Sequence, residues 1–473
     1  MDRIRRVFHS QQPYEPIDGH RDGTAISGDG AEDASEPEEN PFSQVEYWTF
    51  LLMGVAMLWA WNMFLAAAPY FQYRFSSNQW ILAHFQSAEI SISTVTNLGS
   101  MLILTKLQKN ASYPYRIASS LCINIICFTL LALSTLVTTS AALYFGFLML
   151  MVFGASFATG LIQNGLFAYV SGFGRSEYTQ AIMTGQAVAG VLPCLAQIGA
   201  VLAVPARNQQ SPSQAPAESP ASASAYFLTA TAVSVIALLA FLYLLRRRRS
   251  ATLPRAIQPP ATKPTTNGTS EGHNNTPVIN TSPSPSPEER KPELGSKPAI
   301  PLTRLLRLLP ILSAAVFLTF ALTMIFPVFT IRIHSLHPDL LPSTLFIPLA
   351  FLVWNVGDLL GRLLTLSPSL RLTHRPSVLL TLSLLRLIFI PLYLLCNISG
   401  TNAGPKVKSD VFYLGVVQLW FGISNGYLGS SCMMGAGEWV AEEEREAAGG
   451  WMGLCLVAGL TVGSLLSFFV GTA

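Results

Sequence analysis

Three polar residues in one apolar segment are the first candidates for chemistry. In residues 346–362, Asn355, Asp358 and Arg362 follow one another at intervals of three and four residues. This spacing places all three on one face of a helix. An ionised group at the centre of a membrane helix costs roughly 2.5 to 3.5 kcal/mol, so it normally faces protein or a water-filled cavity. The pattern favours a polar stripe that lines a route for a solute. The alternative is a neutralised charge pair that only stabilises helix packing.

Side-chain amides in other apolar segments could recognise a flat polar ligand. Gln163 lies between glycines, Asn62 follows Trp61, and Gln186 lies in a segment of small residues. An amide offers both a donor and an acceptor, which suits the edge of a heterocycle. It also serves to hydrogen-bond a neighbouring helix. The residues alone leave both roles open.

No combination of residues predicts catalysis or a metal site. The seven histidines are scattered, and the six cysteines show no Cys-x-x-Cys spacing. The polar motifs in the apolar segments contain no nucleophile beside a base. We therefore expect a protein that is not an enzyme and that needs neither a metal nor another cofactor.

The composition indicates which elements must position these side chains. Of 473 residues, 50% are apolar and only 12% are charged, about half the charged share of a soluble protein. We expect an all-α polytopic protein in a lipid bilayer, with about eleven transmembrane helices. The small net charge of +3 argues against nucleic-acid binding. The expected spans are residues 46–70, 81–105, 116–137, 141–170, 180–204, 225–245, 304–330, 343–366, 377–397, 411–434 and 447–471.

Breaks in composition divide the chain into four parts. Residues 1–45 are polar and predict a disordered cytosolic tail, and residues 246–303, rich in Pro, Ser and Thr, predict a disordered cytosolic loop. The six spans of residues 46–245 and the five of residues 304–473 then predict two helical bundles, in a 6+5 major-facilitator-like arrangement. The run Arg246–Arg249 and the basic loop after the second span place the N-terminus in the cytosol.

Several of these segments, taken in order along nearly the whole chain, resemble the equilibrative nucleoside transporter family. The Asp-x-x-x-Arg helix and the Ser-Asn-Gly-Tyr-Leu segment are the most specific. Three departures concern Ala60, Thr159 and Ala168, which stand where the family often has proline or glycine. The segments that carry the resemblance are Trp61-Asn62, Gln163 with Gly165-Leu-Phe167, residues 185–190, Phe346-Ile-Pro348, Asn355 to Arg362, residues 386–397 and Ser424-Asn-Gly-Tyr-Leu428.

The resemblance implies a substrate site in a central cavity between the two bundles. By that resemblance, Gln163 bonds the nucleobase edge, and Asp358 and Arg362 contact the ribose hydroxyls. The remaining expected contacts are apolar walls from Leu58, Trp61 and Leu460, with Phe351 and Asn355 on the side of the second bundle. An amide, an apolar slot and charged groups together suit a flat heterocycle carried on a sugar.

We therefore expect a monomeric carrier that moves nucleosides, with free nucleobases as a second substrate class, down their gradients by alternating access. Asp358 and Arg362 are expected to be the only charges deep in the spans. Because a mutually compensated pair is a poor proton carrier, we do not expect obligatory proton coupling. Proton-coupled nucleoside transport, a carrier for another small polar solute, and a receptor with a transporter-like body are the alternatives. The expected location is the plasma membrane or a vacuolar or lysosomal membrane.

Overall fold

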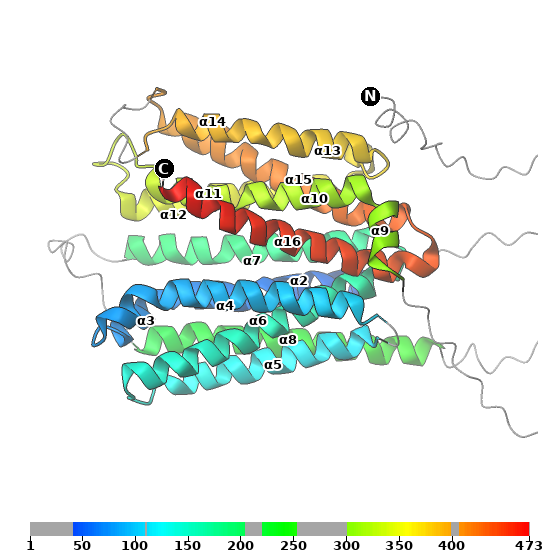
Figure 1. Cartoon of the computed structure of the whole chain (residues 1–473), viewed down its shortest axis with the longest axis horizontal. Helices are drawn as coiled ribbons and strands as arrows, with labels where there is room; N and C mark the ends of the chain where they lie inside the picture. Colours follow the sequence, from blue (N-terminus) through cyan, green and yellow to red (C-terminus); the bar gives the residue numbers. More distant parts are fainter. Residues whose placement is uncertain (1–40, 109–110, 204–219, 253–299, 399–405, 473) are drawn as a thin grey trace, which may run out of the picture. The chain divides into compact units, whose positions relative to one another are not determined.

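The computed structural model describes residues 41–108, 111–203, 220–252, 300–398 and 406–472, and these are helical almost throughout (Figure 1). Most of the tail and of the central loop predicted from the sequence lie outside the described residues. The long helices of the first part are α2 (Gln44–Ala66), α4 (Gln79–Lys106), α5 (Tyr113–Ser134), α6 (Ala141–Ser171), α7 (Ser176–Ala203) and α8 (Pro220–Thr252). Those of the second part are α10 (Pro310–Thr323), α12 (Ser343–Leu364), α13 (Pro376–Leu385), α15 (Leu419–Gly435) and α16 (Arg445–Thr472).

The chain is a multi-pass membrane protein, as the composition predicts. Within the described residues, nine helical stretches are long and apolar enough to cross a membrane. Two of the predicted spans are not among the nine. One coincides with α4, which carries His84, Glu89 and Asn97, and the other with α15, which is rich in glycine and serine. These polar and small residues lower the mean hydropathy, so the exact count of eleven is not confirmed.

Several predicted spans are interrupted rather than continuous. The first divides at Ala67 into α2 and α3 (Ala68–Arg74), where Pro69 occupies the start of the second helix. The seventh divides into α9 (Leu302–Leu308), α10 and α11 (Ile325–Arg332). The ninth contains the 3-10 turn η4 (Arg386–Ile388) and then α14 (Phe389–Leu394), and the tenth begins with the π-helix η5 (Phe412–Gln418). Proline lacks a backbone N–H and clashes with the preceding turn, which accounts for the break at Ala67.

Glycines allow two helix pairs to approach closely. A Cβ atom on Gly185 of α7 would lie 2.0 Å from the carbonyl oxygen of Leu51 of α2, and one on Gly361 of α12 would lie 2.1 Å from that of Ile423 of α15. In this way α2 packs along α7, and α12 packs along α15. Helix α7 also packs along α12, and α16 along α6 and α4, so helices from both parts of the sequence meet at these contacts. The division into two bundles at residues 46–245 and 304–473 stays a prediction.

Candidate functional site

Asp358 and Arg362 form the buried ion pair that their spacing on α12 predicts. Arg362 Nε lies 2.8 Å from Asp358 Oδ2, and the two residues are only 5% and 3% exposed. The second oxygen of the carboxylate, Oδ1, accepts a hydrogen bond of 2.7 Å from Asn425 Nδ2 of α15. The carboxylate is therefore bonded through both oxygens and has a fixed orientation.

The guanidinium of Arg362 connects α12 to α7. Its Nη1 donates to the backbone carbonyl of Met183 and, at 3.2 Å, to Oε1 of Gln186. The backbone oxygen of Arg362 also accepts a hydrogen bond of 3.2 Å from Gln180 Nε2. The same arginine thus compensates the aspartate within α12 and contacts a helix from the first part of the sequence.

The expectation that this pair holds the only deep charges is wrong. Arg386, in the turn between α13 and α14, is 2% exposed, and Glu89 of α4 is 5% exposed. Arg386 falls inside an apolar run, where one charge has little effect on a hydropathy average, whereas Glu89 lies in α4 among several other polar residues. Their sequence positions nevertheless indicate two further functional candidates, since each lies well inside a predicted span, where a charged residue is costly.

Gln163 lies on α6 with a free acceptor atom. It is 5% exposed, and its Oε1 is buried without a hydrogen-bond partner among the described residues. An unsatisfied buried acceptor costs about 1 to 3 kcal/mol, so such atoms are usually satisfied by water or by a ligand. By contrast, Asn62 Nδ2 donates to the carbonyl of Ala189 at 2.7 Å, and Gln186 Nε2 to Met57 Sδ at 2.9 Å. Those two amides join helices, as the packing alternative predicted.

Asn355 lies at the contact between α12 and α7. Its Nδ2 donates to the carbonyl of Phe351 at 2.9 Å and lies 3.6 Å from Cys194 Sγ of α7. Phe351 itself packs edge-on against Phe326 of α11, with ring centroids 5.0 Å apart. Asn355 therefore lies next to α7, the helix that Arg362 also contacts. The two residues are two turns apart on α12.

The three expected apolar wall residues are all partly buried. Trp61 lies near Phe64 of α2, with ring centroids 6.5 Å apart, and Leu58 lies one turn before Trp61. Leu460 of α16 packs against the main cluster of buried side chains, which also contains Met57 and Met183. Partial exposure leaves all three with surface that a ligand could cover.

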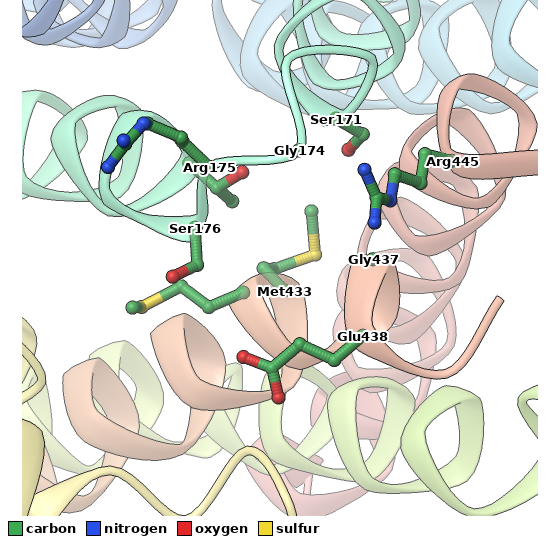
Figure 2. Close-up of a pocket in the computed structure, with 10 residues that line it drawn as sticks. Ser171, Gly174, Arg175, Ser176, Met433, Gly437, Glu438 and Arg445 are labelled. Atoms are coloured by element: carbon green, nitrogen blue, oxygen red, sulfur yellow. The ribbon is translucent and has the colours of Figure 1, made fainter. Parts of the chain in front are cut away.

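A separate polar cavity of about 100 Å³ lies between the α6–α7 turn and the region where α15 ends and α16 begins. Figure 2 shows Arg445 pointing toward Ser171 and Gly174, and a Cβ on Gly174 would lie 2.5 Å from Arg445 Nη1. Glu438 also lines the cavity and lies 3.3 Å from the His374 ring. The residues expected to bind substrate do not line this cavity, so it is distinct from the candidate site.

The described part of the chain contains no disulfide bond and no cluster of three metal-binding side chains. Five cysteines are buried, Cys122 is exposed, and none is disulfide-bonded. No group of three His, Cys, Asp or Glu residues there is arranged to hold a metal ion.

Comparisons with known sequences agree on one family. The sequence profile of the nucleoside transporter family matches residues 148–472. Nucleoside transporter FUN26 of Saccharomyces cerevisiae is 28% identical over 453 residues, covering 91% of this chain and 85% of that protein. Equilibrative nucleoside transporter 1 of Rattus norvegicus is 29% identical over 465 residues (89% and 95%), and its Homo sapiens counterpart is 27% identical over 462 residues (89% and 95%).

Solved structures confirm the fold. The major facilitator superfamily transporter FucP, in the outward conformation, superposes with a TM-score of 0.52 at 16% identity, covering 91% of this chain and 92% of FucP. The proton:xylose symporter XylE, bound to 6-bromo-6-deoxy-D-glucose, gives a TM-score of 0.52 at 11% identity, covering 90% and 88%. The major-facilitator-like arrangement expected from the sequence is confirmed.

Proposed function

The chain belongs to the nucleoside transporter family, and from this premise we propose that it carries nucleosides across a membrane, down their concentration gradient, by alternating access. It is a carrier and not an enzyme, because binding and release of an unchanged substrate need no bond-making group. In this mechanism the two groups of helices separate first on one side of the site and then on the other.

One observation carries the proposal: Arg362 of α12 donates across to the backbone of Met183 on α7. An alternating-access carrier must break and re-form contacts between its halves at each cycle. A few directed hydrogen bonds suit this better than an interlocked apolar core, because they can exchange for bonds to substrate or water at little net cost. The buried charge pair thus lies where the helices must part.

The substrate contacts follow from this arrangement. Gln163 contacts the nucleobase through its free Oε1, which accepts a hydrogen bond from an exocyclic amine or a ring N–H. Asp358 and Arg362 bind the ribose hydroxyls when the bonds from Arg362 to Met183 and Gln186 are released. The carboxylate accepts from the vicinal hydroxyls, and the guanidinium donates to them.

Apolar and aromatic side chains complete the proposed site. Leu58, Trp61 and Leu460 cover the faces of the base, and Phe351 and Asn355 close the site on the α12 side. These apolar contacts are made to the base and not to the sugar, so free nucleobases are a second substrate class. We further propose that the carrier is a monomer, that its N-terminus faces the cytosol, and that it resides in the plasma membrane or a vacuolar or lysosomal membrane.

The test is uptake of tritiated adenosine and uridine by proteoliposomes, with and without an imposed pH gradient. Saturable uptake that is indifferent to the gradient is expected. Gln163→Ala should raise KM by roughly tenfold, equivalent to about 1.4 kcal/mol for a lost hydrogen bond. Gln79→Ala, at the exposed start of α4, is the matched control and should behave as the parent protein. Absence of nucleoside and nucleobase uptake by folded protein would refute the proposal and favour a carrier for another small polar solute.

A further inference from the structure

Arg386 is a buried cation whose direct partners among the described residues are all neutral. Its Nε donates to Ser424 Oγ at 3.1 Å, Nη1 donates to the carbonyl of Thr319, and Nη2 lies 3.4 Å from Thr323 Oγ1. The guanidinium carbon also lies 4.6 Å from the ring centroid of Phe421. A charge removed from water at this depth is rarely retained without a function or a counter-ion within reach.

The counter-ion is reached through two side chains. Thr323 Oγ1 donates to Asn425 Oδ1 at 2.5 Å, and Asn425 Nδ2 donates to Asp358 Oδ1 at 2.7 Å. A continuous hydrogen-bonded path therefore runs from Arg386 through Thr323 and Asn425 to Asp358. This path lies entirely within α10, α12, α15 and the turn after α13.

The two ends of the path set the direction of its bonds, because Arg386 only donates and the carboxylate of Asp358 accepts. Arg386 can only donate, so the Thr323 oxygen accepts from it, and the single hydroxyl proton of Thr323 has two acceptors in reach, Asn425 Oδ1 at 2.5 Å and the carbonyl of Thr319 at 2.8 Å. Because the carboxylate of Asp358 accepts from the amine of Asn425, the oxygen of Asn425 faces Thr323. The Asn425 amine then donates to Asp358 Oδ1 while Arg362 Nε donates to Oδ2, so both oxygens of Asp358 act as acceptors.

We propose that Arg386 is a positioning residue for the substrate site, which acts on Asp358 through Thr323 and Asn425. This inference rests on the proposed function, because it gives Arg386 a role only if Asp358 meets substrate. The bonds from Arg362 to α7 must break during transport, whereas the path from Arg386 need not break. Asp358 thus keeps its orientation when Arg362 exchanges partners.

A purely architectural Arg386 would predict something different. If the arginine only fixes the turn after α13 against α10 and α15, then its bond to Ser424 should matter as much as its bond to Thr323. If it positions Asp358, then only the Thr323 branch should affect substrate. The two branches can be cut separately because Ser424 is not on the path to Asp358.

The experiment compares Thr323→Val, Thr323→Ser and Ser424→Ala in proteoliposomes. Thr323→Val removes the hydroxyl at nearly constant volume and should raise KM for adenosine by at least roughly tenfold, the change that about 1.4 kcal/mol produces, with Vmax and melting temperature little altered. Thr323→Ser restores the hydroxyl and should restore KM. Ser424→Ala should leave KM near that of the parent protein. Equal effects of Thr323→Val and Ser424→Ala, or a fall in melting temperature and Vmax without a change in KM, would overturn the proposal.

A second measurement does not depend on transport. The infrared carboxylate band of Asp358, assigned by its loss in Asp358→Asn, should shift in Thr323→Val and return in Thr323→Ser, while Ser424→Ala leaves it in place. A band unmoved in Thr323→Val contradicts the path from Arg386, even if nucleosides are carried. A shifted band together with no nucleoside uptake by the parent protein would support the positioning path and refute the proposed function.

Discussion

The side-chain oxygen of Asn355 lies 2.3 Å from the position that a Cβ atom would occupy on Gly190. The backbone of α7 therefore approaches this side chain of α12 as closely as a glycine allows. Under the proposed mechanism these two helices separate during transport, so the local shape at this contact matters as well as the charges two turns further along α12.

Gly190→Ala is expected to displace Asn355 and loosen the contact between α7 and α12. Because the displaced atom is the end of a side chain, the protein should still fold, and initial uptake should change by several-fold. Gly199→Ala on the same helix is the control, since a Cβ there meets nothing within 4 Å. The double variant Gly190→Ala with Asn355→Ala should take up no less substrate than Asn355→Ala alone, since the shorter side chain makes room. Uptake in Gly190→Ala equal to that in Gly199→Ala would contradict this view of the contact.

The contact between α12 and α15 makes a different prediction, because backbone meets backbone. A Cβ on Gly361 would lie 2.1 Å from the oxygen of Ile423 and 2.7 Å from the nitrogen of Tyr427. Gly361→Ala must push the helices apart, and overpacking of this kind costs about 1 to 3 kcal/mol. The melting temperature in detergent should fall, while Gly415→Ala, where a Cβ meets nothing within 4 Å, should leave it unchanged. An unaltered melting temperature in Gly361→Ala would show that this pair can separate freely.

Local features of the fold were predictable from sequence because they depend on neighbouring residues. The span expected at 81–105 is α4 at Gln79–Lys106, and the span expected at 141–170 is α6 at Ala141–Ser171. Long apolar runs determine such ends. The pairing of Asp358 with Arg362 was equally accessible, since an interval of four residues is one helical turn.

The remaining contacts of the site were not predictable, because they join residues far apart in the chain. Asn425 is 67 residues from Asp358, and Met183 is 179 residues from Arg362. No spacing rule relates such positions, so the bonding of the carboxylate through both oxygens emerged only from the packing of α12 on α15 and α7. Arg386 lies in residues 386–397, a segment that carries part of the family resemblance, and its partners Thr323 and Ser424 are also remote in sequence.

Removal of Asp358 should be more damaging than removal of Arg362. Asp358→Asn leaves two buried guanidiniums, those of Arg362 and Arg386, without a carboxylate. Arg362→Gln leaves Asp358 still bonded to Asn425 and within reach of Arg386 through Thr323. Breaking a buried ion pair typically costs about 3 to 5 kcal/mol, and we expect Asp358→Asn to lie at the upper end. Thermal unfolding monitored by intrinsic tryptophan fluorescence measures the difference.

The double variant Asp358→Asn with Arg362→Gln is the control for charge. It removes one charge of each sign, so its melting temperature should lie above that of Asp358→Asn alone. Nucleoside uptake should remain lost, since the proposed ribose contacts are missing. A melting temperature lower in Arg362→Gln than in Asp358→Asn would argue against an electrostatic contribution from Arg386.

Glu89 offers a test of proton coupling. Glu89 is buried and lies, in helical register, between Phe85 and Ile92 of α4, which pack into an apolar cluster, and its Oε1 has no hydrogen-bond partner among the described residues. An ionised carboxylate is costly in such surroundings, whereas a glutamine of the same shape carries no charge. Glu89→Gln should therefore keep the melting temperature and change uptake by no more than about twofold, as for Glu443→Gln at an exposed position. The opposite outcome is that the parent protein accumulates adenosine under an imposed proton gradient and Glu89→Gln does not. Glu89 would then bind the transported proton, and the protein would be a proton symporter and not an equilibrative carrier.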